Sequence, residues 1–311
     1  MTPGSMARRI PPCRLALAAI AALLYAGCYA AIKGGLVYAA PFRFAALRSL
    51  AGGLALIAFL ILTRERLLPA RRLWLPIALL AAIGPVIGFA AMFTSPLHTG
   101  AGLASVVGNT GPLLTIGLGA IFLGEQVTAG KTTALVFGMA GVTLLALPNA
   151  ASIGSWHATA LALPLVAALS GASESVIVKR VRPGADVLAL AAWQFVLAAP
   201  VLFGLSAWLE PQESIRWTRT FVLVLAFLAG GATATAAGLW YWLVQREEVS
   251  RISLVLFLAP VAGLGLGAAL FGERLAPIQA AGALLVLVGI ATVAAERTRG
   301  ASMGPRQQVK T

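Results

Sequence analysis

Two charged residues lie inside long apolar stretches of the sequence, where a charge is costly unless it has a partner or a function. Arg48 is the only base inside such a stretch, and Glu174 is the only acid clearly inside one. Arg48 could bind a carboxylate through both arms of its guanidinium group, or it could pair with Glu174. Glu174 could take up and release protons, or it could be neutralised by Lys179 and Arg180, which follow it closely.

Further polar and aromatic side chains in the apolar stretches could contact a small molecule. Asn109 could bind a solute or form a hydrogen bond to a neighbouring helix. Tyr25 and Tyr29 are four residues apart and so share one face of a helix. Trp193 and Gln194 lie in the middle of another apolar stretch. Such side chains would form a mostly apolar site with a few polar groups that fix the ligand.

The run Trp240-Tyr241-Trp242 lies at the end of an apolar stretch, which is typical of the aromatic belt at a membrane interface. Stacking of these rings on a solute is the alternative interpretation.

Two prolines and two glutamates occupy matched positions. Pro112 and Pro260 each lie about midway along an apolar stretch, where proline removes a backbone hydrogen bond and bends a helix. These bends could be hinges or simple packing kinks. Glu125 and Glu273 each follow a proline by thirteen residues and stand at a short helix junction. A glutamate there favours the positive end of the next helix, and a gating contact is the alternative.

The composition indicates a membrane protein. The chain has 311 residues, of which 59% are hydrophobic and 11% charged, whereas soluble domains carry about 25% charged residues. The apolar residues form blocks of roughly 18 to 22, the length that spans about 30 Å of hydrocarbon as a helix. In lipid, a helix satisfies its own backbone groups. The sequence predicts spans at about 15–32, 41–62, 74–95, 101–122, 131–148, 157–178, 186–208, 220–243, 251–271 and 277–295.

The net charge of +13 comes from bases in short loops and tails. No aromatic-rich basic groove accompanies them, so nucleic acid is not expected as a partner. With the N-terminus in the cytoplasm, 17 of the 23 Lys and Arg residues fall in inside segments and five in outside loops. This bias predicts a multi-pass membrane protein with both termini cytoplasmic.

An internal repeat relates the two halves of the chain. Residues 112–125 contain Pro, Gly-Leu-Gly-Ala and a final Gly-Glu, and these recur in 260–273 at an offset of 148. Upstream, 45–48 corresponds to 191–194 at an offset of 146. Each half holds five spans, an odd number, so the second half must enter the membrane from the opposite face. The expected fold is therefore an all-α polytopic membrane protein of ten transmembrane helices arranged as two inverted five-helix repeats.

These motifs resemble the EamA domain of the drug/metabolite transporter superfamily. The similarity rests on the Pro to Gly-Glu runs, each followed by a glycine at 141 or 289, and on Tyr25–Lys33 and Ala46–Arg48 as first- and second-helix motifs. It covers about residues 15–295, and it departs from the family pattern at Gln194, where the family has Arg. The resemblance implies export of amino acids and other metabolites across a bacterial inner membrane.

The sequence thus predicts a cytoplasmic N-terminal segment at 1–14, two EamA-like five-helix repeats at 15–150 and 151–295, and a cytoplasmic tail at 296–311. The expected function is that of a secondary-active transporter, which exports an amino acid or amphipathic metabolite by alternating access. Its partners would be the small-molecule solute and the lipid bilayer. Protons are a candidate coupling ion because the chain has no Walker motif for ATP hydrolysis. The oligomeric state stays open.

Three alternatives remain. They are uptake by the same fold, a passive channel and an intramembrane enzyme that modifies a lipid. One Asp, two scattered His and the lack of GxSxG and HExxH motifs argue against the enzyme. The sequence therefore predicts no catalytic residue, no metal site and no cofactor.

Overall fold

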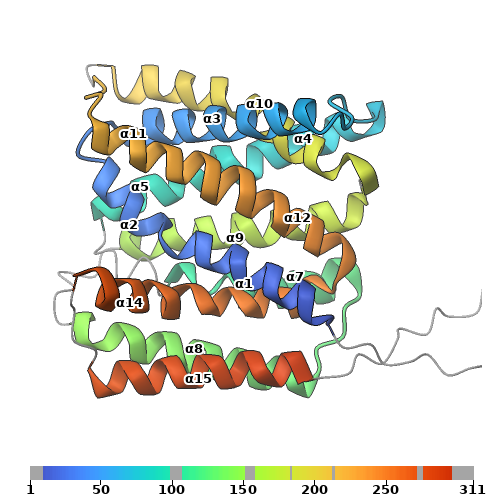
Figure 1. The fold of residues 1–311 in the computed structure, drawn as a ribbon, viewed down its shortest axis with the longest axis vertical. Coiled ribbons are helices and arrows are strands. Elements are labelled where there is room, and N and C mark those ends of the chain that lie inside the picture. The colour runs from blue at the N-terminus through green and yellow to red at the C-terminus, as the bar shows by residue number, and fades with distance from the viewer. Residues whose placement is uncertain are drawn as a thin grey trace, which may run out of the picture.

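The computed structural model describes residues 10–98, 107–150, 158–182, 184–211, 214–271 and 276–295. Every element in these ranges is helical, and they contain no strand (Figure 1). In the first half of the chain the elements are α1 (Pro12–Ala26), α2 (Cys28–Gly35), α3 (Pro41–Leu62), η1 (Arg71–Leu73), α4 (Trp74–Ala81), η2 (Ala82–Phe89), α5 (Ala90–His98), α7 (Gly111–Leu123) and α8 (Ala129–Ala150).

The elements of the second half are α9 (Ala158–Val181), η3 (Gly184–Asp186), α10 (Val187–Leu209), α11 (Arg219–Ala226), η4 (Phe227–Thr235), α12 (Ala236–Arg246), α13 (Val249–Ser253), η5 (Leu254–Phe257), α14 (Leu258–Phe271) and α15 (Pro277–Ala295).

Eight helical segments in the described part of the chain are long and apolar enough to cross a membrane. Two shorter apolar helices, Gly111–Leu123 and Val249–Gly263, lie at the other two predicted spans. The protein is therefore an all-helical, multi-pass membrane protein. The count of ten spans and the inversion of the halves stay predictions.

The most extensive contacts between helices join one half of the chain to the other. In Figure 1, α3 and α10 lie side by side at one edge of the molecule, and α8 and α15 do so at the opposite edge. Glycines permit the close approach of α8 and α15. A Cβ on Gly141 would lie 2.6 Å from the carbonyl oxygen of Gly282, and a Cβ on Gly282 would lie 2.7 Å from that of Gly141. Small residues let membrane helices pack backbone to backbone in this way.

The third helix of each half contains a π-helical segment, η2 in the first and η4 in the second. π-Helical turns are rare and are frequently found at functional sites. In η2, Pro85 has no N–H to donate to the preceding turn, so the regular hydrogen-bond ladder cannot continue through it. The sequence predicted uninterrupted spans at 74–95 and 220–243, and the two π segments are an addition to that prediction.

The two matched prolines occupy different positions in their helices, and only Pro112 departs from the expected mid-helix position. Pro112 stands in the first turn of α7, and Pro260 is the third residue of α14, which follows the 3₁₀ segment η5. In the first turn of a helix the missing N–H of proline costs no hydrogen bond. Pro112 thus begins a helix, whereas Pro260 lies within the continuous helical run Val249–Gly263, just after its 3₁₀ segment.

Candidate functional site

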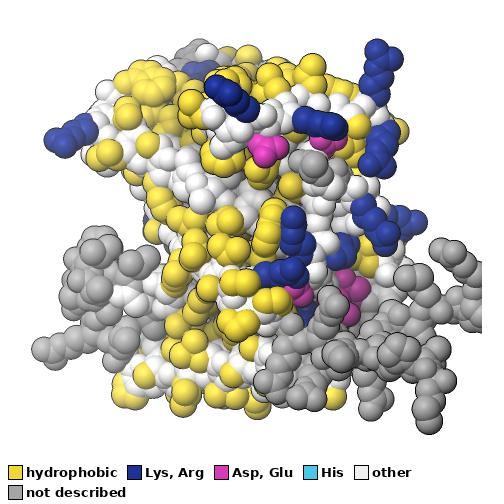
Figure 2. Space-filling model, turned by 45° about the vertical axis from the view of Figure 1, so that its right-hand side comes forward, with side chains coloured by type: hydrophobic (Ala, Val, Ile, Leu, Met, Phe, Trp, Pro, Cys, Tyr) yellow, Lys and Arg dark blue, Asp and Glu magenta, His cyan; other side chains and the backbone are white. Residues whose placement is uncertain are grey.

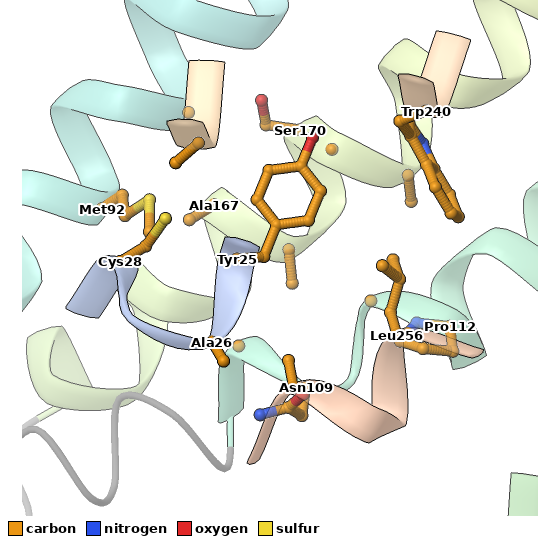
Figure 3. A pocket seen from close by; sticks show the side chains of 18 of the residues that line it. Tyr25, Ala26, Cys28, Met92, Asn109, Pro112, Ala167, Ser170, Trp240 and Leu256 are labelled. Atoms are coloured by element: carbon orange, nitrogen blue, oxygen red, sulfur yellow. The ribbon is translucent and has the colours of Figure 1, made fainter. Parts of the chain in front are cut away.

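A cavity of about 580 Å³ lies among helices of both halves. Its walls are mostly apolar and aromatic, and Figure 3 shows Tyr25, Met92, Leu256 and Trp240 around it. Asn109, Ser170 and several threonines and serines add polar groups. Among the described residues that line the cavity, only Arg48 and Glu174 are charged. The two charged residues singled out in the sequence therefore meet in one site.

Arg48 is almost fully buried, with 2% of its surface exposed. Its Nε donates a hydrogen bond of 2.9 Å to Thr233 Oγ1, and its guanidinium carbon lies 4.3 Å from the centre of the Phe89 ring. Nη1 reaches only the thioether sulfur of Met92, at 3.9 Å. Arg48 forms no ion pair with Glu174 or with another described carboxylate. The expected alternative of an Arg48–Glu174 pair is therefore not realised, and the buried cation has only weak compensation.

Glu174 is held by one of its two carboxylate oxygens. Tyr241 Oη donates to Glu174 Oε1 at 2.9 Å, and Gln194 Nε2 donates to the same atom at 3.2 Å. Gln194 Nε2 also donates to Tyr241 Oη at 2.7 Å, which closes a triangle of hydrogen bonds. Oε2 accepts no hydrogen bond from the described residues, and Glu174 lines the cavity. The carboxylate thus has an acceptor left for a ligand.

The bases that follow Glu174 along α9 have other partners. Lys179 Nζ donates to the carbonyl of Glu247 at 2.6 Å, and Arg180 Nη1 donates to that of Phe122 at 3.1 Å. Neither base forms an ion pair with Glu174, so the structure does not support the alternative in which Lys179 and Arg180 neutralise it.

Two glycines of η2 create the space for the polar side chains of α9. A Cβ on Gly84 would overlap the carboxylate of Glu174, and a Cβ on Gly88 would overlap the hydroxyl of Ser170. Ser170 Oγ donates to the carbonyl of Ile83 at 2.6 Å within the π segment. Sequence reasoning missed these glycines, although their GxxxG spacing within a predicted span was a usable signal.

Four other predicted site residues line the same cavity. They are Tyr25, Asn109, Pro112 and Pro260. In Figure 3 the ring of Tyr25 reaches into the cavity toward Ser170. The side chain of Tyr29 lies outside what the structure describes, so the shared face proposed for the two tyrosines stays a prediction.

Trp193 does not line the cavity. Its indole Nε1 donates to the carbonyl of Leu67 at 2.9 Å, and its ring centre lies 5.4 Å from that of Trp74. Its neighbour Gln194 is fully buried and reaches the site only through Glu174 and Tyr241. Adjacent residues of a helix point about 100° apart, since a turn takes 3.6 residues. A mid-span position alone therefore could not decide which of the two faces the site.

Tyr241 and Trp240 line the cavity, although the sequence pattern favoured a place for them in the aromatic belt at the membrane interface. The aromatic-belt interpretation is wrong for both, because they are buried and line the cavity. Trp240 Nε1 donates to Ser175 Oγ at 3.0 Å, so both rings are tied to α9.

Glu125 caps a helix of the other half rather than the next helix along the chain. Its carboxylate accepts from the backbone N–H groups of Val249 at 2.7 Å and Ser250 at 2.8 Å, and from the Ser250 hydroxyl. Gly124, with a φ of +67°, ends α7 in the left-handed conformation that glycine tolerates. Gly119 leaves room for the carboxylate, because a Cβ there would lie 3.2 Å from Glu125 Oε2. Glu273 lies outside the described residues.

Further contacts join the two halves at the same end of the molecule. Lys131 Nζ lies 3.0 Å from Glu248 Oε2, and Arg14 Nη1 lies 2.7 Å from Glu247 Oε1. The side chain of Lys131 is only 1% exposed, so its charge is compensated mainly by Glu248 and little by solvent. Figure 2 shows Lys and Arg side chains gathered toward the end of the bundle where α1 begins and α15 ends. This is the end predicted to face the cytoplasm.

The described residues contain no group of three or more His, Cys, Asp or Glu side chains placed to hold a metal ion.

A bundle of apolar helices around one internal, sparsely charged cavity is the architecture of a membrane transporter. The model of the EamA-like transporter family matches the chain twice, at residues 14–147 and at 158–295. The chain belongs to the EamA-like transporter family.

Curated relatives support the same class. A probable amino-acid metabolite efflux pump of Salmonella typhimurium is 30% identical over 84% of this chain and 88% of its own length. An uncharacterized transporter of Bacillus subtilis, YvbV, is 29% identical over 84% of this chain and 85% of its own. One solved crystal structure superposes with a TM-score of 0.78 at 19% identity, covering 91% of this chain and 96% of that one. That likeness concerns the fold alone.

Proposed function

We propose that this protein is a secondary-active transporter that exports a small metabolite, an amino acid or amphipathic compound, by alternating access. The observation that carries the proposal is the cavity, which is lined by helices of both halves and holds an Arg and a Glu that do not form an ion pair. A cavity between two halves can open to either side when one half rocks against the other.

The pattern of helix contacts supports the inverted arrangement of the halves. α1, the first helix of one half, packs on α12 and α14 of the other. α9, the first helix of the second half, packs on α5 and α7 of the first. This reciprocal exchange is expected when two similar halves are related by a two-fold axis, and the odd number of predicted spans in each half would place that axis in the membrane plane.

Arg48 is proposed to bind an anionic group of the solute. A buried guanidinium whose neighbours are a hydroxyl, two sulfur groups and two aromatic rings has no anionic partner among the described residues. A carboxylate could accept two parallel hydrogen bonds from it. The names of curated relatives, which include amino-acid metabolite efflux pumps, agree with a solute that carries a carboxylate.

Glu174 is proposed to couple transport to protons. Its carboxylate faces Tyr241 from α12, Gln194 from α10 and the cavity itself, across which Arg48 of α3 and Tyr25 of α1 also lie. Protonation removes its charge while Tyr241 and Gln194 stay in place, so the carboxyl group can change state without dismantling the site.

Glu125 is proposed to belong to the gate at the predicted cytoplasmic end. Its bonds to Val249 and Ser250, with the Lys131–Glu248 ion pair, tie the first half to the second there. Opening the cavity toward that side requires these contacts to separate. The corresponding role of Glu273 at the other end follows from the repeat alone.

Counterflow in proteoliposomes tests the proposal. Vesicles are loaded with one unlabelled solute from a panel of amino acids and amphipathic metabolites, and entry of the labelled solute is followed with and without a pH gradient. We expect transient accumulation driven by an internal substrate, with a further response to the gradient. Uptake by the same fold would give the same counterflow and differ only in the direction of the driving gradient. Downhill flux without counterflow would instead identify a channel and refute the proposal.

A further inference from the structure

The two charged residues of the cavity belong to corresponding groups of three residues in the two halves. At the offset of 146, Cys28 corresponds to Glu174 and Arg48 to Gln194. At the offset of 148, Phe93 corresponds to Tyr241. We name Cys28, Arg48 and Phe93 the Arg48 triad, and Glu174, Gln194 and Tyr241 the Glu174 triad.

Contacts within the two triads correspond as well. The Arg48 guanidinium lies beside the Cys28 thiol and 5.8 Å from the centre of the Phe93 ring. In the Glu174 triad, Gln194 lies between Glu174 and Tyr241 and bonds to both, at 3.2 and 2.7 Å. The chemistry differs, since one triad has a base and no acid whereas the other has an acid and no base.

We propose that these triads are two subsites of opposite charge in one cavity, and that Glu174 Oε2 binds a cationic group of the same solute whose anionic group Arg48 binds. This inference rests on the proposed function and adds the solute class: small molecules with both a positive and a negative group, in preference to simple amines or simple acids. A positively charged group with N–H donors finds at Oε2 the acceptor that the described residues leave unused.

Tyr241 and Gln194 are positioning residues in this scheme. Each donates a hydrogen bond to Oε1, which holds that oxygen and leaves Oε2 without a hydrogen bond from the described residues. Gly84 lies on the Oε1 side, where a Cβ would overlap the carboxylate. Phe93 takes the place of Tyr241 in the Arg48 triad, where no carboxylate has to be held and a phenyl ring offers its face to the guanidinium.

The solute would also link the two halves. Arg48 lies on α3 of the first half, and Glu174 lies on α9 of the second. A solute bound by both charges joins the halves, whereas a solute with one charge engages one half only. Dipolar solutes should therefore be favoured in the step that requires both halves to close on the substrate.

Competition against the labelled substrate found by counterflow tests the inference on the full-length protein. The competitors form matched sets that share one side chain: phenylalanine, phenethylamine and 3-phenylpropionate, with the same three forms for leucine and methionine. We expect at least one zwitterion to compete about tenfold more strongly than both of its singly charged analogues, as for the loss of one charge-assisted hydrogen bond. Equal competition by the singly charged forms, or no competition by any zwitterion, would overturn the inference while counterflow itself still stood.

Three variants assign the subsites. Glu174→Gln should remove the preference for the zwitterion over the acid, and Arg48→Gln should remove its preference over the amine. Tyr241→Phe should raise the KM of the zwitterion several-fold and leave competition by the acid unchanged, which a merely structural defect would not do. If Tyr241→Phe weakened the acid and the zwitterion equally, the positioning role would be refuted.

Discussion

The contact between Gly84 and Glu174 yields the sharpest energetic prediction. A Cβ at position 84 would overlap Oε1 and Cδ of Glu174 and lie 3.0 Å from its Cγ. The carboxylate cannot simply swing aside, because Oε1 holds the bonds from Tyr241 and Gln194. If the carboxylate stays in place, the overpacking typically costs about 1–3 kcal/mol. If the carboxylate moves instead, the loss of its two hydrogen bonds costs a similar amount. Gly84→Ala should therefore lower the free energy of unfolding by about 1–3 kcal/mol and impair transport.

Gly230 supplies a matched control in the corresponding π segment, η4. A Cβ there meets nothing within 4 Å. Gly230→Ala should be neutral or stabilise the protein by up to about 1 kcal/mol, because alanine loses less conformational freedom in a helix than glycine. Thermal unfolding of the purified protein in detergent compares the two variants, and counterflow compares their transport.

A double-mutant cycle isolates the contact itself. In a Glu174→Ala background the overlap no longer exists, so the cost of Gly84→Ala should shrink by about 1 kcal/mol or more. If Gly84→Ala were as stable and as active as Gly230→Ala, or if its cost were the same with and without the carboxylate, the reasoning about this contact would be refuted.

Three further predictions concern single residues. Glu125→Ala should reduce the free energy of unfolding by about 1–3 kcal/mol because it leaves the N–H groups of Val249 and Ser250 without an acceptor; an unchanged melting curve would contradict this. Glu174→Gln should abolish the response of transport to a pH gradient while solute exchange persists, as measured in proteoliposomes, and unchanged pH dependence would remove Glu174 from the coupling mechanism. Arg48→Lys should weaken binding of a carboxylate-bearing solute less than Arg48→Gln does but still raise its KM, because an ammonium lacks the planar fork; equal KM values in both variants and the wild type would exclude Arg48 from the binding site.

Hydrophobic length predicts most of the helices. The expected span 41–62 coincides with α3, and the expected span 277–295 coincides with α15. In lipid, a run of apolar residues has few alternatives to a helix. The π segments could not be predicted in the same way, because their hydrogen-bond pattern depends on packing against α9 and α3 as well as on Pro85 and Gly230-Gly231.

The charged residues of the site were predictable from the sequence, because a charge inside an apolar span has a high energetic cost. Arg48 and Glu174 stand out because a charge inside an apolar span needs an explanation, and both line the cavity. Their partners were not predictable, since Tyr241 meets Glu174 across 67 positions of the sequence. Trp193 was misplaced for a related reason. The rotation of α10 about its axis is fixed by its contacts with α3 and α4, and no pattern within α10 itself reveals it.

The Gly124-Glu125 motif could be recognised in the sequence, but the helix that Glu125 caps could not. Gly-Glu at a helix junction indicates a turn and a cap. The helix that is capped, α13, begins 124 residues further along the chain, and only the three-dimensional packing of α7 on α13 brings the two together.

Access to Cys28 tests the central claim of alternating access most directly. Its thiol lines the cavity beside Arg48, and replacing the exposed Cys13 with Ser leaves Cys28 as the only cysteine of the chain. A small membrane-impermeant methanethiosulfonate would be applied to right-side-out and inverted vesicles, with and without transported solute. The account predicts labelling from either side, slowed by solute, with Glu125→Ala increasing labelling from the cytoplasmic side and decreasing it from the other. Labelling from one side only under all conditions, or a simultaneous increase from both sides, would contradict it.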